Sequence, residues 1–222
     1  MSSVTAASPP TRAGRPKSRE KEADIRRAAT DLFLAHGLKG TSMDAVAQAA
    51  GVSKQTVYSH FGSKEDLFAA VIEGKVTAYR LSGQESPSGQ GLRDELEMIG
   101  ERFVELLFDD EVTAMFRVVI GESITHPQIA RLFHAAGPER TIEALARRLA
   151  DHAKAGELHL ESERDAAVTF LNLLRGEFHM RRLMNLCPRV PERQRRDHVR
   201  ACVSQFLRLF GTPAKRLSNP RN

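Results

Sequence analysis

Residues 41 to 68, TSMDAVAQAAGVSKQTVYSHFGSKEDLF, hold three helix start signals within one short stretch. Thr41 and Asp44 have the spacing of a capping box, as do Ser63 and Asp66, and Ser53 is of a type that commonly caps a helix. The stretch therefore predicts two short helices around a tight turn, followed by the start of another helix.

The turn between the two short helices is marked by glycine. Gly51 can adopt the left-handed conformation that ends the first helix, with Val52 packing back toward Ala47. Val52 and Val57 then occupy the two positions of a hydrophobic staple for the second helix. This layout is typical of a helix-turn-helix.

Helices are also expected on both sides of this segment. One begins at Ser18, ends at Gly37 and is closed by a contact of Leu38 with Phe33. Another runs from Lys64 to about Arg80. Each carries an apolar face at helical spacing, formed by Ile25, Ala28, Ala29, Leu32 and Phe33 in the first and by Leu67, Phe68, Val71, Ile72, Val76 and Tyr79 in the second.

Beyond residues 81–91, a loop rich in Gly, Ser and Pro, apolar residues recur only with helical periods and no segment alternates as a strand. The sequence predicts an all-α fold of about nine or ten helices, with a break at Gly137-Pro138. The expected later helices are 92–108, 112 to about 123, 128–136, 138–155, 162 to about 186 and 191–210.

The last two expected helices are apolar on more than one side. Either both faces are buried within one chain, or two helices from each of two subunits form a four-helix interface. We favour the second interpretation, a homodimer through residues of about 162–210.

The charge of the chain indicates a negatively charged binding partner. The net charge is +5 and the pI about 9.5, and the first 19 residues carry Arg12, Arg15, Lys17 and Arg19 without any acid. Residues 1–17 are expected to be a disordered basic arm that would meet a polyanion, and 213–222 a flexible tail.

No apolar run resembles a signal peptide or a membrane span, so we expect a cytoplasmic protein that does not enter a membrane. Cys187 and Cys202 lack the spacing of a zinc site and are expected to be reduced. No metal and no cofactor is expected.

The second helix of the motif has the chemistry of a DNA-reading helix. With Val57 and Phe61 facing inward, Gln55 and Ser59 face outward with Thr56 and Tyr58 beside them. Such a helix fits the major groove. We expect base contacts from Lys54, Gln55 and Thr56, and phosphate contacts from Thr41, Ser42, Tyr58, His60 and Lys64.

In the alternative interpretation, Tyr58 and His60 only cap a small core, and Lys54 and Lys64 are solvated surface charges.

Residues 18 to 68, including Gly51-Val52, the VYSHF run and SKEDL, resemble the TetR family of bacterial transcriptional regulators. The resemblance implies a helix-turn-helix domain over 18–63, a linking helix over 64–80, and an effector-binding and dimerisation domain over 81–212. The DNA contacts that it implies are Thr41, Ser42, Ser53, Lys54, Gln55, Thr56, Tyr58, His60 and Lys64.

A regulator of this type needs a ligand that prefers one conformation over another. The candidate effector-binding residues are aromatic, apolar or charged side chains of the later helices, namely Phe103, Phe116, Glu122, Phe133, Phe170, Leu174 and Arg175, with Leu107, Val119, Glu177 and His179 as further possibilities. The alternative for each is ordinary core packing, and for Glu122 an ion pair with Arg117 or Arg175.

An enzyme lacks support, because the sequence has no phosphate-binding glycine loop, no nucleophile elbow and no HExxH helix. A DNA-compacting protein would carry more positive charge, and a protein-docking adaptor remains a third alternative. We expect a homodimeric repressor that a small molecule releases from a palindromic operator. An activator or an effector-independent regulator would have the same reading head.

Overall fold

The structure is a computed structural model that describes residues 15–83, 91–186 and 189–213. Within these residues the fold is all-α, and Leu158 and Gly211 form an isolated bridge rather than a strand. The arm over 1–14, most of the tail over 213–222, Cys187 and most of the 81–91 loop lie outside the described residues.

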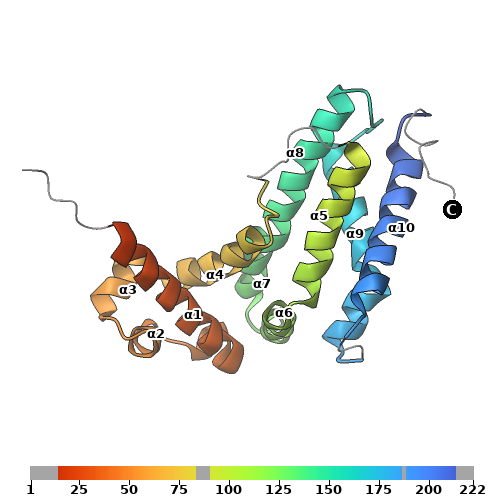
Figure 1. Ribbon diagram of the computed structural model, residues 1–222. Coiled ribbons are helices and arrows are strands. Elements are labelled where there is room, and N and C mark those ends of the chain that lie inside the picture. The colour runs from red at the N-terminus through yellow and green to blue at the C-terminus, as the bar shows by residue number, and fades with distance from the viewer. Residues whose placement is uncertain (1–14, 84–90, 187–188, 214–222) are drawn as a thin grey trace, which may run out of the picture.

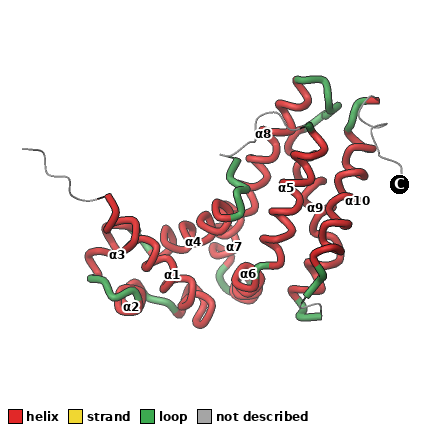
Figure 2. Tube along the Cα trace, viewed as in Figure 1, coloured by secondary structure: helices red, strands yellow, loops and turns green. Residues whose placement is uncertain are grey.

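Three N-terminal helices form a small head that α4 joins to a larger helical bundle, with α6 and α7 lying between the two (Figure 1). In the bundle, α5, α8, α9 and α10 stand side by side, and Figure 2 shows the helices and, within the described ranges, the loops next to them. The bounds are α1 (Arg15–Gly40), α2 (Met43–Ala49), α3 (Lys54–His60), α4 (Lys64–Ala78), α5 (Leu92–Phe108), α6 (Asp110–Ser123), α7 (Pro127–His134), α8 (Arg140–Lys154), α9 (Glu163–Leu183) and α10 (Glu192–Phe210).

Helix capping in the head follows the sequence pattern except at one position. Ser53 and Ser63 cap α3 and α4 by accepting hydrogen bonds from Thr56 N and Asp66 N. Gly51 has φ 65°, and the amide of Val52 donates to Ala47 O at 3.0 Å, as the glycine turn requires.

The predicted cap at Thr41 is wrong, because Ser42 caps α2 by accepting a hydrogen bond from Ala45 N. The hydroxyl of Thr41 is buried and donates to Gly37 O at 2.8 Å instead. That carbonyl is available because α1 breaks at Gly37, where φ is 71°. The break therefore moves the cap by one residue.

The apolar residues form two cores, and the boundary between these cores differs from the domain boundaries predicted from the sequence. Side chains of α6 and α7, including Met115, Val119 and Phe133, join Phe33 and Val57 in the core of the head. The second core is built from the end of α4 and from α5, α8, α9 and α10. The head is thus packed on a segment that lies beyond residue 110 in the sequence.

A polar contact also joins α1 to α6. Glu122 accepts a hydrogen bond from the amide of Leu38 at 3.2 Å, directly after the break at Gly37. The alternative of an ion pair with Arg117 or Arg175 does not hold among the described residues, since Arg117 donates to the carbonyls of Leu183 and Arg182 and Arg175 donates to Asn172.

Gly37→Ala is expected to destabilise the protein more than Gly51→Ala. Both glycines have a positive φ, and Gly37, with φ 71° and ψ 175°, lies in a region that essentially only glycine adopts, where strain costs about 1 to 3 kcal/mol. At Gly37 a Cβ would also overlap the carboxylate of Glu122, whereas at Gly51 it would meet open space. Urea unfolding of both variants measures the difference.

The control for this prediction is Glu122→Ala. Measured relative to that variant, Gly37→Ala should cost less than it does in the wild type, because the overlap is gone and only the backbone strain remains. Equal losses for the two glycine variants in the wild-type background would contradict the steric explanation.

Two features of the bundle differ from expectation. Gly137-Pro138 does not break the chain into two helices, because a π-helical turn over Ala135–Glu139 carries α7 directly into α8. Such a turn tolerates the missing amide of Pro138. Conversely, α9 was expected to be continuous and is interrupted at Gly176, where φ is 48° and ψ is −162°.

The boundaries of other helices differ by a few residues. Helix α1 begins at Arg15, three residues before Ser18, so the described part of the expected arm is helical. Helices α4 and α9 end at Ala78 and Leu183, a little earlier than predicted.

Candidate nucleic-acid interface and effector cavity

The orientation of α3 is the one that a reading helix needs. Val57 is fully buried and Phe61 is 6% exposed, which fixes the inner face of α3 on the core of the head. Lys54, Gln55 and Ser59 are exposed, and Tyr58 is 51% exposed. The predicted outward face of α3 is confirmed.

Two predicted base-contact residues of α3 already have polar partners in the head. Lys54 forms an ion pair with Asp44 of α2. Both side chains of that pair are mostly exposed, so the pair contributes at most about 1 kcal/mol and Lys54 can leave it for a base or a phosphate. The hydroxyls of Thr56 and Ser53 are 2.8 Å apart and hydrogen-bonded to each other. The third predicted base-contact residue, Gln55, is exposed, so its amide can reach a base edge.

The predicted phosphate contacts surround the starts of α2 and α4. The ammonium of Lys64 donates to Thr41 O at 2.9 Å and so ties these two helix starts together. Ser42 is exposed, and His60 is half-buried. Thr41 is only 3% exposed, and its hydroxyl is occupied within the head, so we remove its side chain from the candidate contacts.

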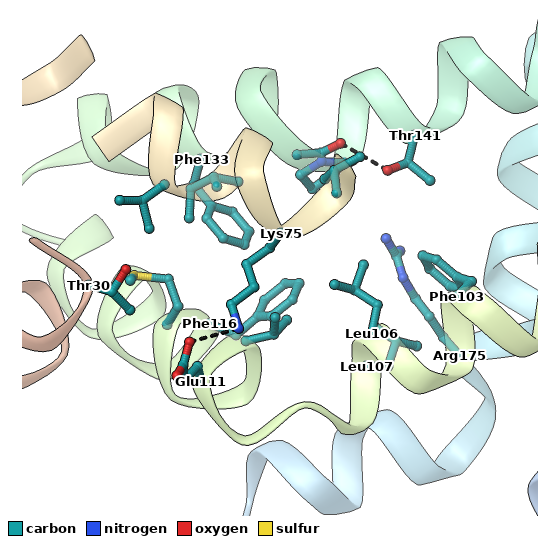
Figure 3. A pocket seen from close by; sticks show the side chains of 17 residues that line it. Thr30, Lys75, Phe103, Leu106, Leu107, Glu111, Phe116, Phe133, Thr141 and Arg175 are labelled. Atoms are coloured by element: carbon teal, nitrogen blue, oxygen red, sulfur yellow. Dashed lines mark hydrogen bonds and ion pairs between the residues drawn. The ribbon is translucent and has the colours of Figure 1, made fainter. Parts of the chain in front are cut away.

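An apolar cavity of about 60 Å³ lies between the two cores. Figure 3 shows its walls, which come from α1, α4, α5, α6, α7, the α7–α8 junction and α9. Val71, Ile72 and Met115 of its wall belong to the head core, whereas Phe103 and Leu107 belong to the bundle core. A molecule that expands this cavity would therefore move the head core relative to the bundle core.

Four of the seven candidate effector-binding residues line this cavity: Phe103, Phe116, Phe133 and Arg175. The other three do not. Phe170 and Leu174 point into the bundle core, where they are 0% and 2% exposed. Glu122 is bound to the amide of Leu38.

Sequence reasoning missed the polar residues Lys75, Glu111, Thr30 and Thr141 in the cavity wall. A signal for Lys75 was present, since it follows Val71 by four residues and Ile72 by three and so shares the apolar face of α4. No comparable pattern marks Thr30 or Thr141, which reach the cavity from helices far apart in the sequence.

An ion cluster holds α4 to the start of α6 beside this cavity. Lys75 lies 3.1 Å from Asp109 and 2.7 Å from Glu111, and the hydroxyl of Tyr79 donates to Asp109 at 2.9 Å. Burial and the bond to Asp109 raise the pKa of Tyr79 to about 12, so the phenol stays protonated and keeps donating. Burial alone would lower the pKa of Lys75, but the two carboxylates outweigh it and raise that pKa.

The described residues contain no cluster of His, Cys, Asp and Glu arranged to hold a metal ion. Within the same ranges, no helix is both long enough and apolar enough to cross a membrane.

Comparison with known proteins identifies both parts of the chain. Residues 25–71 match the family model described as bacterial regulatory proteins of the tetR family. Residues 94–212 match the model of the C-terminal domain of the AefR-like transcriptional repressor. The second match alone covers more than half of the 222 residues.

Two curated regulators are similar over part of their length. The chain is 31% identical to the transcriptional activator FasR of Mycolicibacterium smegmatis over 114 residues, which are 50% of this chain and 51% of FasR. It is 28% identical to the transcriptional regulator UidR of Escherichia coli over 60% of this chain and 67% of UidR. The chain thus spans about half to two thirds of the length of these two relatives.

Solved structures extend the similarity to almost the whole chain. The flavonoid-responsive regulator FrrA is 33% identical, covers 88% of this chain and 99% of its own, and superposes with a TM-score of 0.72. A TetR-family regulator from Mesorhizobium loti is 26% identical, covers 90% of this chain and 100% of its own, and has a TM-score of 0.70. The capped three-helix head with its exposed reading helix is consistent with both family models and with these solved structures. The chain therefore belongs to the TetR family and is a DNA-binding transcriptional regulator, not an enzyme.

Proposed function

We propose that this protein is a homodimeric repressor that binds a palindromic operator through α3 and leaves it when a small molecule occupies the cavity between the two cores. The observation that carries the proposal is the exposed polar face of α3, held outward by the buried Val57 and Phe61. We assign DNA binding to residues 18–63, the link to 64–80, and effector binding and dimerisation to 81–212. Such a regulator works in the cytoplasm, beside the DNA.

In this proposal the side chains of the head have two kinds of role. Lys54, Gln55 and Thr56 contact base edges in the major groove, where amide and cationic side chains discriminate between base pairs. Ser42, Ser53, Tyr58, His60 and Lys64 contact phosphates, which fix the position of the head without reading sequence.

A dimer is supported by apolar side chains that the single chain leaves exposed on α9, just beyond it and on α10. The apolar stripe of α10 that first indicated a dimer is buried within the chain and cannot meet a partner. The exposed residues are instead Met180, Met184 and Leu186 at and beyond the end of α9, and Leu209 near the end of α10. Two heads joined in this way would need a separation of about 34 to 36 Å to enter successive major grooves.

The position of the cavity explains how a bound ligand would release the protein from its operator. Its wall includes α4 and α6, and α6 also holds the break of α1 through Glu122 and the amide of Leu38. A ligand that separates α4 from α6 would therefore change the direction of the head and the spacing of two heads in a dimer. Differential binding to the two conformations is what moves the equilibrium.

Activation is the second candidate function. FasR is described as an activator, whereas the model that matches residues 94–212 is described by a repressor. The DNA-binding head is compatible with both outcomes, and in vitro transcription from the operator-bearing promoter distinguishes them.

Replacing single residues of α3 and its surroundings tests the proposed roles. Gln55→Ala or Lys54→Ala is expected to relax base preference by about 1 to 3 kcal/mol for each lost bidentate contact. Tyr58→Phe and Lys64→Ala should weaken binding to all sequences by similar factors, because phosphates carry no sequence information. Fluorescence anisotropy on fragments from the upstream region of the gene, with and without mutated half-sites, measures both effects.

Gln128→Ala is the matched control, since it removes an exposed amide from α7, outside both the head and the helices α9 and α10 that carry the proposed dimer contact. It should leave affinity and specificity unchanged. Uniform weakening by Gln55→Ala together with relaxed specificity in Tyr58→Phe would reverse the assigned roles. Binding that any competitor DNA abolishes equally well would contradict site-specific recognition, which normally exceeds non-specific binding by about a thousandfold or more.

A further inference from the structure

The two cations in the wall of the cavity have different surroundings. Lys75 is neutralised by Asp109 and Glu111. Arg175 also lines the cavity, but among the residues that the structure describes no carboxylate forms an ion pair with it. Arg175 donates a hydrogen bond to the neutral amide oxygen of Asn172, at 3.1 Å.

The backbone break in α9 fixes the position of Arg175. The break lies at Gly176, the next residue, and side chains of α10 bind the carbonyls before it. His198 Nε2 lies 3.0 Å from Leu174 O, and the thiol of Cys202 donates to Leu173 O at 3.3 Å. Figure 3 shows the side chain of Arg175 running past Phe103 and Leu106 into the interior.

Burial lowers the pKa of Arg175, as expected for a guanidinium that loses water without gaining a counter-charge. Arg175 nevertheless remains protonated at neutral pH, as arginine does in proteins. Because no carboxylate pairs with it among the described residues, no counter-charge offsets the cost of removing its charge from water. An anion at this position would recover that cost by a charge-assisted and potentially bidentate contact.

His179 shows the same local excess of positive charge. Burial, followed by the charge of Arg175, lowers the pKa of His179 to about 4, so the imidazole is neutral at pH 7. Its Nδ1 is buried without a hydrogen-bond partner among the described residues, and its ring packs against Phe116 of the cavity wall at 5.1 Å. A positively charged ligand would find this end of the cavity unfavourable.

We propose that the cavity binds an apolar molecule with one anionic group, in the simplest case a carboxylate, which pairs with Arg175 while the apolar body lies among Phe103, Phe116 and Phe133. The role of this ligand as an effector depends on the proposed function. The ligand-binding chemistry itself does not depend on that function.

The size of the cavity indicates how such a ligand would act. Ligand sites usually enclose about 300 to 1,000 Å³, several times the present volume of about 60 Å³. An apolar acid must therefore push the walls apart, and the walls that face each other belong to the two different cores. The ion pair with Arg175 would hold the ligand against α9 and supply binding energy for the expansion. The facing helices, α4 and α6, would then be the ones that move.

Two matched sets of small molecules test the proposal by isothermal titration calorimetry on the full-length protein without DNA: octanoate, octanamide and octylamine, and cinnamate, cinnamamide and cinnamylamine. The wild-type protein should bind the carboxylate of at least one set about tenfold or more tighter than the neutral amide, and bind the amine most weakly. Arg175→Gln should remove this preference. Arg147→Gln, the same change at an exposed position of α8, should retain it.

Arg175→Lys keeps the charge without the planar fork and should retain a reduced preference, so it also reports on the site if Arg175→Gln does not fold. The proposal is wrong if amides or amines bind as tightly as carboxylates, if no member of either set binds, or if both Arg175 variants keep the full preference. It is also wrong if Arg175→Gln turns a wild-type dimer into a monomer in sedimentation, because Arg175 would then serve a subunit contact. Operator binding without any of these molecules tests the proposed function separately.

Discussion

Phe33→Ala is expected to lower the free energy of unfolding by about 3 to 5 kcal/mol, the usual cost of removing a buried aromatic side chain. Phe33 is fully buried, and its ring meets that of Phe68 edge to face with centroids 5.4 Å apart. Most domains are stable by only about 5 to 15 kcal/mol, so this variant should lose much of its stability. Because an unfolded head cannot bind DNA, it should also lose most of its operator binding at about 37 °C. Urea unfolding followed by circular dichroism measures the loss.

Ile124→Ala is the control for Phe33→Ala. Ile124 is 87% exposed at the end of α6, and its truncation should change stability by less than about 0.5 kcal/mol. A loss below about 1 kcal/mol for Phe33→Ala would show that the core of the head can collapse around the missing ring, contrary to its packing.

Glu95→Ala is expected to cost about 3 kcal/mol, because it removes a buried carboxylate to which two basic side chains of the bundle bond. Glu95 is 8% exposed and accepts hydrogen bonds from Arg148 at 2.6 Å and from His152 at 2.9 Å. Glu97→Ala is the matched control, since Glu97 is more exposed and lies 3.7 Å from Arg93. That substitution should cost less than about 1 kcal/mol.

The pH dependence of stability should change with the same substitution. Burial alone would lower the pKa of His152, but its hydrogen bonds to Glu157 and Glu95 outweigh burial and raise the pKa above 6.5. The stability that protonated His152 contributes is therefore fully present below pH 6.5 and is lost as pH rises through the raised pKa. Urea unfolding at about pH 6 and about pH 8 should show a smaller decline in Glu95→Ala than in the wild type. A steeper decline in the variant would contradict this role of Glu95.

The local signals in the sequence were sufficient for the head. Serine caps, a glycine that needs a positive φ and the spacing of Val57 and Phe61 are all short-range patterns, and each appears in the structure. The cap at Thr41 failed because its hydroxyl is taken by a carbonyl that the break at Gly37 releases. Two adjacent hydroxyl residues cannot be ranked as caps without that tertiary contact.

The cavity was only partly predictable, because its wall is assembled from helices far apart in the sequence, from α1 to α9. Helical periodicity identified Phe103, Phe116 and Phe133 as inward residues but did not show which core they face. On α9, Leu174 and Arg175 are neighbours that point in different directions, one into the bundle core and one into the cavity, because successive residues of a helix are turned by about 100°. The partner of Glu122 is a backbone amide 84 residues away, which no residue pattern encodes.

The packing of α6 and α7 into the head has a consequence for protein engineering. A chimaera that transplants this head, cut after α4, onto the bundle of a relative would leave behind Met115, Val119 and Phe133. The recipient would have to supply side chains of matching volume at those positions, since a mismatch leaves either a void or an overlap. Exchange of operator specificity between relatives should therefore succeed by regrafting the exposed side of α3 alone, and fail when the whole N-terminal unit is moved without its α6 and α7 supports.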